Sequence, residues 1–311
     1  MATKASLLRG VADPIGAGAA LRSMQPDASV TPSGVVTDPH ELVARALAIL
    51  DEQTTDPNPP VGLPVLSRSE RQGPAPADLP LQQRVLSDGT TCPLPIRYFD
   101  DLCLIATFLT DLGRASALLQ KTGLTAVPQE DGKAVVAFGC FQYRKTDIGP
   151  YNEVGLTILA TAPGDRTPAL YVTDLPVDTA SANRAGREIW GYNKFVAAID
   201  IADDRKNFSM TIRDPANVTI AAFTGTRGAS IPMPPNDILT FSLLEGRVVK
   251  TLIRVVTPSQ LGSGNGFVLE IGESAHPMAN NLRALALDGA TPVLVQYADP
   301  FQSLLFPGQM A

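Results

Sequence analysis

Apolar residues occur in short runs separated by polar turns from about residue 91 to the end of the chain. Polar turns at 214–217 and 245–247 each join two such runs, which predicts two β-hairpins. The predicted strands are 102–109, 134–143, 154–160, 169–172, 196–201, 208–213, 218–224, 238–244, 248–256, 267–271, 281–287 and 291–297. Many short strands joined by polar turns favour an antiparallel barrel or sandwich.

Two stretches interrupt this pattern with helical signals. The first covers 112–119, where Asp111 is suited to cap the helix N-terminus. The second covers 178–188, with its first residue as the predicted cap, several alanines that favour helix, and Gly191 as the terminator. Lys194 is therefore expected where a helix is followed by a strand.

The first 90 residues differ from the rest of the chain because they are rich in proline. Such a composition resists regular structure and predicts an arm or linker. One helix is predicted within it, at about 39–51, where Asp38 is a suitable N-cap and Pro39 suits the first helical turn. We therefore divide the 311 residues into an arm, 1–90, and a main domain, 91–311.

Composition and charge exclude several classes of function. The formal charge of -6 and the absence of a basic stripe argue against nucleic-acid binding. No apolar run reaches the ~18 residues that a membrane-spanning helix needs. The N-terminal stretch is a poor secretory signal because Asp13 and Pro14 interrupt its apolar residues. A cytoplasmic location is the expectation.

The cysteines and histidines carry no recognisable metal or disulfide pattern. Three cysteines without paired spacing give no disulfide framework. His40 and His276 lie far apart without Cys or acidic partners at ligand spacing, so no metal site is predicted. Both histidines are interpreted as structural or surface residues, and this scarcity also weakens any Ser-His-Asp hypothesis.

The segment 186–195 carries the strongest chemical signal, because it places Lys194 among Trp190, Tyr192 and Phe195. An amine in apolar surroundings is costly to keep charged, and a neutral amine attacks ketones to form a Schiff base. The alternative is an ordinary surface lysine whose stem lies along an aromatic ring. Spacing alone favours this second interpretation.

Three short motifs resemble those of the acetoacetate decarboxylase family. Gly186-Arg187-Glu188 precedes Lys194 as in the family's Schiff-base motif, with the lysine six residues after the glutamate. Two further pieces occur in the family's order, Pro150-Tyr151-Asn152-Glu153 and Ile96-Arg97-Tyr98-Phe99. The resemblance covers about residues 91–311 and leaves 1–90 uncovered. It implies an α+β fold that is mainly antiparallel β, a barrel with a few helices, assembled as a homo-oligomer. The N-terminal arm inferred from composition is added to this barrel.

The resemblance also implies roles for individual residues. Lys194 is the nucleophile and needs no cofactor besides its own Schiff base, and Glu153 carries protons. Arg97 binds the substrate carboxylate through paired hydrogen bonds, or else forms a structural ion pair. The aromatic residues expected to line the substrate pocket, with core packing as the alternative, are Trp190, Tyr192, Phe138 and Tyr143. Arg187 and Glu188 are expected to be structural.

The chain departs from the family pattern at three positions. Phe195 replaces a second lysine, so desolvation alone would have to favour the neutral form of Lys194. Asn193 replaces a proline, and Gly139 takes the position of an active-site glutamate. The implied function is decarboxylation of a small β-keto acid, acetoacetate or a relative. Two alternatives remain. One is an aldolase or dehydratase that uses the same lysine, and the other is a non-catalytic barrel that binds a small molecule.

Overall fold

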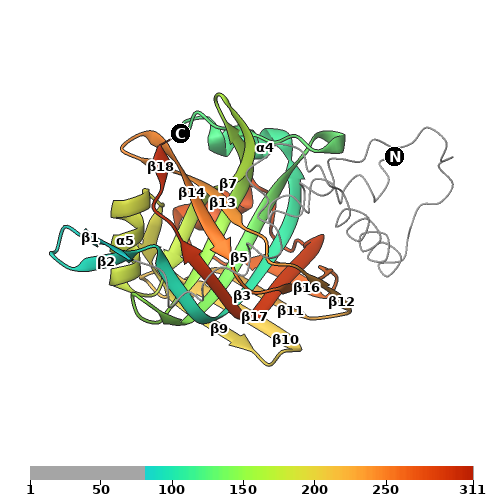
Figure 1. Cartoon of the computed structure of the whole chain (residues 1–311). Helices are drawn as coiled ribbons and strands as arrows, with labels where there is room; N and C mark the ends of the chain where they lie inside the picture. Colours follow the sequence, from blue (N-terminus) through green and yellow to red (C-terminus); the bar gives the residue numbers. More distant parts are fainter. Residues whose placement is uncertain (1–80, 311) are drawn as a thin grey trace, which may run out of the picture.

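A computed structural model describes residues 81–310 of the chain, so the predicted helix at 39–51 lies outside the described part. Within the described residues, the first strand begins at Gln82, in the region predicted to be an arm. Strands β1 (Gln82–Val85) and β2 (Thr91–Leu94) form a separate two-stranded hairpin beside helix α5 (Ala180–Trp190), at the left of Figure 1.

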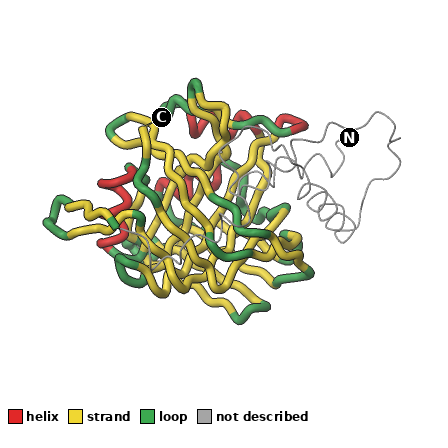
Figure 2. Tube along the Cα trace, viewed as in Figure 1, coloured by secondary structure: helices red, strands yellow, loops and turns green. Residues whose placement is uncertain are grey.

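Strands make up most of the described chain, and the helices lie at its periphery (Figure 2). The two other α-helices are α4 (Leu112–Leu119) and α6 (Pro277–Ala284). The remaining strands are β3 (Ile96–Asp111), β4 (Thr125–Ala126), β5 (Lys133–Thr146), β6 (Tyr151–Ala162), β7 (Asp165–Val177), β8 (Lys194–Val196), β9 (Ala198–Asp203), β10 (Asn207–Arg213), β11 (Thr219–Thr226), β12 (Ser230–Met233), β13 (Ile238–Leu244), β14 (Arg247–Val255), β15 (Ser259–Ser263), β16 (Phe267–Ile271), β17 (Leu294–Leu305) and β18 (Gln309–Met310).

The largest sheet closes on itself. Its central order is β17-β3-β5-β6-β7-β13-β14, and an additional pairing of β14 with β17 completes the ring. Neighbours in this ring pair antiparallel, except for the short parallel contact between β7 and β13. The expectation of a mainly antiparallel β fold with a few helices is confirmed. Closure leaves no free edge along the ring, because each strand of the ring has a hydrogen-bonded neighbour on both sides.

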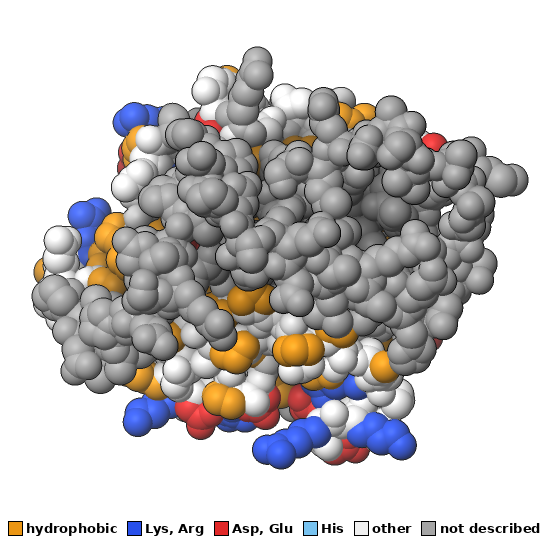
Figure 3. Space-filling view, turned by 45° about the vertical axis from the view of Figure 1, so that its right-hand side comes forward, with side chains coloured by type: hydrophobic (Ala, Val, Ile, Leu, Met, Phe, Trp, Pro, Cys, Tyr) orange, Lys and Arg blue, Asp and Glu red, His pale blue; other side chains and the backbone are white. Residues whose placement is uncertain are grey.

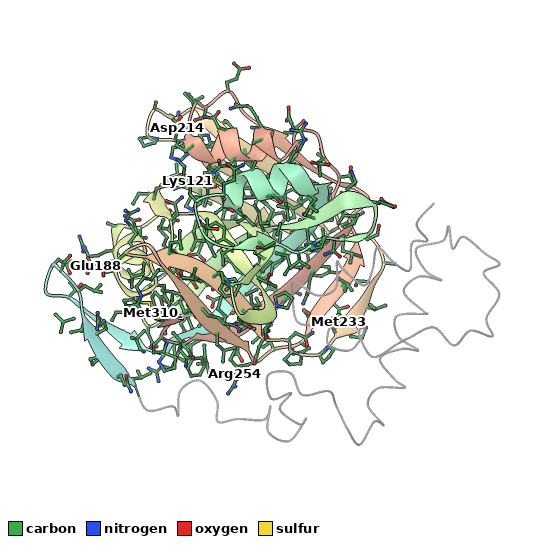
Figure 4. The ribbon with its side chains drawn as sticks, turned by 90° about the horizontal axis from the view of Figure 1, so that it is seen from above. Lys121, Glu188, Asp214, Met233, Arg254 and Met310 are labelled. Atoms are coloured by element: carbon green, nitrogen blue, oxygen red, sulfur yellow. The ribbon has the colours of Figure 1, made fainter. Side chains whose placement is uncertain are left out.

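A second sheet, β16-β11-β10-β9, packs against the outside of the ring and forms the main core with it. Phe223 on β11 lies at the centre of that core, with ring centroids 6.4 Å from Phe108 and 6.0 Å from Phe138. Helices α4 and α6 lie side by side at one end (Figure 4), where Thr110 and Arg114 donate hydrogen bonds to the last carbonyls of α6. The second sheet and these two helices therefore pack on the outside of the ring and do not enter it.

Ion pairs flank the outer sheet. Arg213 pairs with Asp200 on its exposed side, whereas the paired side chains of Arg227 and Asp203, 2.5 Å apart, are buried. Basic and acidic side chains lie next to one another at the lower edge of Figure 3. None of the helices within residues 81–310 is long and apolar enough to cross a membrane.

The predicted helices are present, with one difference in capping. Helix α4 begins after Asp111, whose side chain accepts a hydrogen bond from the Arg114 amide as expected. Helix α5 is instead capped by Thr179. The prediction that Asp178 caps this helix is wrong, because its carboxylate accepts a hydrogen bond from the amide of Asn152 on β6. Asp178 therefore joins the start of the helix to the ring.

The strand predicted at 281–287 is wrong, because most of this segment belongs to helix α6. His276 caps that helix, Pro277 occupies its first turn, and Met278 and Leu282 are buried one helical turn apart. The cap hydrogen bond, 3.2 Å from the Met278 amide to His276 Nδ1, gives this histidine a structural role. The strand predicted at 196–201 is divided between β8 and β9 by Ala197.

Gly191 ends α5 in the left-handed region, with φ of 68°, and a Cβ atom there would lie 2.3 Å from the Leu243 carbonyl oxygen. Gly246 has a similar φ of 75° but open space around it. We expect Gly191→Ala to lower the free energy of unfolding by about 3 kcal/mol or more, and Gly246→Ala by only about 1 kcal/mol. Urea denaturation measures both, and equal losses would show that the contact with Leu243 is unimportant.

Asp101 is fully buried on β3 and accepts the amides of Arg144 (2.7 Å) and Lys145 (3.3 Å). Burial raises the pKa of Asp101 to about 7 and that of Asp174 to about 6. Since both pKa values lie above the unfolded value of ~3.9, the folded state binds more protons between these limits. The free energy of unfolding should therefore fall by several kcal/mol (on the order of 5–7) as pH rises from ~4 to ~7. Asp101→Asn keeps the accepting oxygen but does not titrate. The free energy of unfolding of this variant should therefore decline less as pH rises, and the remaining decline should be due to Asp174. Superimposable pH profiles of the two proteins would contradict this assignment.

Candidate active site

The amine of Lys194 lies 2.5 Å from the Glu153 carboxylate inside the ring. The lysine comes from β8 and the glutamate from β6, and their side chains are 7% and 10% exposed. Both line a cavity with an empty volume of about 770 Å³, part of it open to solvent. The Lys194 amine also lies 5.5 Å from the ring centroid of Tyr151. The two residues that the sequence nominates for catalysis are therefore in direct contact.

Gly186 explains how the lysine reaches this position. A Cβ atom on Gly186 would lie 2.4 Å from both Cδ and Cε of Lys194. The aliphatic part of the lysine thus lies directly on the backbone of α5, in space that any other residue would fill. The glycine of the Gly-Arg-Glu motif is required by this close approach.

The other two residues of the motif hold backbone segments in place. Arg187 donates a hydrogen bond of 2.9 Å to the carbonyl oxygen of Lys194. Glu188 accepts the amide (2.8 Å) and the hydroxyl (2.5 Å) of Ser87 in the β1–β2 loop. Glu188 lies beside that hairpin in Figure 4. These contacts match the structural roles expected for Arg187 and Glu188.

Residues between the helix and the lysine fix the strand that carries it. Strand β8 pairs parallel with β7, with Lys194 opposite Leu175. The Asn193 side chain donates to the Thr173 carbonyl (2.8 Å), and the hydroxyls of Tyr192 and Thr240 lie 2.7 Å apart. Burial raises the pKa of Tyr192 to about 12, so its hydroxyl stays protonated. Lys194 is therefore held by its own strand as well as by the helix.

Three buried tyrosines surround the carboxylate. The Tyr143 hydroxyl lies 3.4 Å from Glu153, and the hydroxyls of Tyr98 and Tyr151 lie 2.9 Å apart. The ring of Tyr143 packs between the other two, with centroid distances of 4.6 and 4.7 Å. Burial, together with the nearby negative charge of Glu153, raises the pKa of all three phenols well above the usual value. They remain proton donors at every physiological pH.

Phe141 occupies the space opened by Gly139, the position where the family resemblance expects a glutamate. A Cβ atom on Gly139 would lie 2.7 Å from Cε2 of Phe141. The Phe141 ring stacks on Tyr143, with centroids 5.5 Å apart and an interplanar angle of 9°. An apolar ring therefore takes the place of a carboxylate beside Lys194 and Glu153.

Three residues predicted to bind substrate lie elsewhere in the described structure. Arg97 forms a two-point ion pair with Asp147, with 2.9 Å from Nη2 to Oδ1 and 2.9 Å from Nε to Oδ2. Phe138 points to the other face of β5, against Phe223. Trp190 donates a hydrogen bond to the Phe306 carbonyl and stacks on Tyr192. None of the three lines the cavity, whereas Tyr143 and Tyr192 do.

The sequence did not identify Tyr98, Tyr151 or Phe141 as site residues. Tyr151 and Glu153 are two residues apart on β6 and share one face, as do Phe141 and Tyr143 on β5. That alternation could have been used once one residue of each strand was assigned. Tyr98 offered no such signal, because its position depends on the pairing of β3 with β5.

One family model matches the chain. It is described as acetoacetate decarboxylase (ADC) and covers residues 79–252. No curated protein matches the chain. A solved structure of acetoacetate decarboxylase from Legionella pneumophila is similar, with 17% identity, a TM-score of 0.56, and coverage of 70% of this chain and 87% of that one.

Two further solved structures have a similar fold. The enduracididine biosynthesis enzyme MppR complexed with pyruvate has 15% identity, a TM-score of 0.52, and coverage of 72% of this chain and 93% of that one. An acetoacetate decarboxylase-like enzyme from Sphingomonas wittichii RW1 has 16% identity, a TM-score of 0.51, and coverage of 68% and 91%. MppR has also been solved with the condensation product of pyruvate and imidazole 4-carboxaldehyde.

Substitution of Gly186 by alanine tests whether the close contact positions Lys194. The new methyl group must displace the lysine stem and loosen its buried contact with Glu153, which outweighs the about 0.5–1 kcal/mol by which alanine favours the helix. We expect at least a tenfold change in the acylation rate of Lys194 by acetic anhydride, read by peptide mass spectrometry, together with a lower free energy of unfolding. Unchanged labelling of Lys194 would show that the close contact does not position the amine.

Proposed function

Because the chain belongs to the acetoacetate decarboxylase family, we propose that it is a Schiff-base-forming lyase whose nucleophile is Lys194. The proposed reaction is decarboxylation of a small β-keto acid, acetoacetate or a relative. The observation that supports this most directly is the 2.5 Å contact between the buried amine of Lys194 and the carboxylate of Glu153 at the cavity wall.

This contact supplies a route to the neutral amine. Transfer of one proton from Lys194 to Glu153 converts two buried charges into an uncharged amine and an uncharged acid. Burial penalises charged groups, so this transfer costs less here than it would in water. The neutral amine is the nucleophile. Glu153, rather than desolvation alone, is the group that takes the proton.

Schiff-base formation, loss of carbon dioxide and hydrolysis follow from the neutral amine of Lys194 and the protonated Glu153. The Lys194 nitrogen attacks the keto carbon, and the resulting carbinolamine loses its hydroxyl as water with a proton from Glu153. The positively charged iminium then accepts the electron pair of the bond to the carboxylate carbon, which leaves as carbon dioxide. A proton taken up from solvent, the one proton that the decarboxylation consumes, is added to the enamine carbon, and hydrolysis of the resulting iminium releases the ketone and regenerates the lysine. Tyr143, protonated and 3.4 Å from Glu153, is positioned to return a proton.

A second candidate function uses the same iminium for aldol or dehydration chemistry. It is favoured by Gly139 and Phe141, which leave the described cavity with Glu153 as its one carboxylate. The similar fold of MppR, solved with a condensation product of pyruvate, fits this candidate as well. A non-catalytic barrel that binds a small apolar molecule is the third alternative.

Borohydride trapping tests the Schiff base directly. Incubation with acetoacetate, 3-oxohexanoate or pyruvate followed by reduction should add the mass of the reduced adduct to the peptide that contains Lys194. Lys194→Ala should abolish the adduct, and Glu153→Gln should slow its formation by about 10²–10⁴-fold. Lys250→Ala is the matched control, because Lys250 also lies 2.5 Å from a carboxylate, that of Asp165, but outside the cavity.

Each outcome separates the candidates. Carbon dioxide release from a 3-oxo acid supports the decarboxylase, whereas an adduct without carbon dioxide supports aldol or dehydration chemistry. No adduct at Lys194 with any of these compounds would falsify both enzyme proposals and favour the binding protein.

A further inference from the structure

The cavity continues beyond the Lys194–Glu153 pair along strand β6. Glu153, Gly155 and Thr157 are spaced by two residues, so they share the inward face, and all three line the cavity. The rise of a strand places Thr157 about 13 Å from Glu153. The cavity is therefore long in the direction that leads away from the reactive amine.

Two glycines form its floor next to the reactive pair. Gly139 on β5 and Gly155 on β6 are paired directly across the strands. A Cβ atom on Gly155 would lie 3.2 Å from Cδ1 of Leu175, as one on Gly139 would meet the Phe141 ring. Because neither glycine has a side chain, Leu175 and Phe141 lie close against the strands. The floor is consequently apolar.

The far end of the cavity is apolar too. It is lined by side chains from four other strands of the ring, Ile105, Leu170, Ile238 and Phe301. Its one polar side chain, Thr157, already donates a hydrogen bond of 3.1 Å to the Ala137 carbonyl. Among residues 81–310, the charged groups that line the cavity are Lys194 and Glu153, and they face each other. This end offers nothing that would recognise a second carboxylate or a phosphate.

A second, smaller cavity lies behind the same wall. It shares Ile105, Ile238 and Phe301 with the first cavity. Its other lining residues are Cys103, Asn236, Val255, Ser259, Gln296, Tyr297 and Ala298. The three shared side chains separate the two spaces. They therefore limit how far an occupant of the first cavity can extend.

From these features we propose that the carbonyl substrate carries an unbranched apolar chain that lies against Phe141 and Leu175, the side chains that cover Gly139 and Gly155, and ends against Ile238 and Phe301. The substrate class is a medium-chain 3-oxo acid or the corresponding methyl ketone. This inference rests on the proposed Schiff base at Lys194 for its chemistry, but the apolar chain has its own binding site.

Methyl ketones from acetone to 2-octanone test the chain directly, because they form Schiff bases without any later step. At equal, subsaturating concentrations, trapping at Lys194 should increase about fourfold per added methylene group, the ratio that corresponds to burying one CH₂. The shift in Tm that each ketone produces measures binding independently of the adduct, and it should increase in the same order.

Two substitutions should move the chain-length preference in opposite directions. Ala137→Leu fills the far end and should remove the advantage of 2-octanone while acetone is still trapped. Ile238→Ala removes part of the wall to the second cavity and should favour 2-decanone over 2-octanone. Leu159→Ala is the control for lost core volume, because Leu159 is buried in the same cluster without lining either cavity; its preference should equal that of the unaltered protein.

The outcomes distinguish this inference from the proposed function. Adducts at Lys194 with equal yield from acetone and 2-octanone would overturn the apolar chain and leave the Schiff base standing. Tm shifts that grow with chain length without any adduct would overturn the Schiff base and leave the binding site. Neither adduct nor graded Tm shift would overturn both.

Discussion

The site depends on keeping an ammonium and a carboxylate together inside a closed ring of strands. Removing two charges from water is expensive, and the loss is recovered only if their contact is close and the surrounding polar groups are satisfied. Here Lys194 and Glu153 are 2.5 Å apart. Gly186 allows the lysine stem to lie on the helix backbone, and Arg187 fixes the lysine carbonyl. The Gly-Arg-Glu motif is therefore best understood as the device that imposes this contact.

The tyrosines around Lys194 and Glu153 supply uncharged hydrogen-bond donors. Because Tyr98, Tyr143 and Tyr151 stay protonated, they add hydrogen-bond donors without adding charge. With Gly139 and Phe141 where the family resemblance expects a carboxylate, Glu153 is the one acidic group lining the described cavity. The number of protons that the site can hold is thus smaller than the family pattern implies, and phenols are the remaining donors. This difference bears on which enamine reaction the site can complete.

Features set by local sequence could be predicted, and those set by strand pairing could not. Helix α4 and its Asp111 cap follow from neighbouring residues. The family motifs nominate Lys194 and Glu153 as site residues, but their contact joins β8 to β6 and is not specified by either motif. Segment 281–287 was predicted as a strand from its apolar residues, but its leucines, alanines and arginine favour helix, and a cap and a proline upstream start that helix. Arg97 and Phe138 lie next to site residues in sequence, yet alternation along β3 and β5 turns them to the opposite face. Which face is inward depends on how the ring closes, which no single segment specifies.

The two ends of the cavity are lined by different side chains. Lys194, Glu153 and Tyr143 line the reactive end, whereas Ile105, Leu170, Ile238 and Phe301 line the far end. Substitutions in the second group can change the volume available to an occupant without disturbing the helix that presents the amine. Mutations in the cavity wall can therefore change which substrates fit while Lys194 and Glu153 stay in place. Proteins that descend from one ancestor could acquire new substrates by exchanging only a few wall residues.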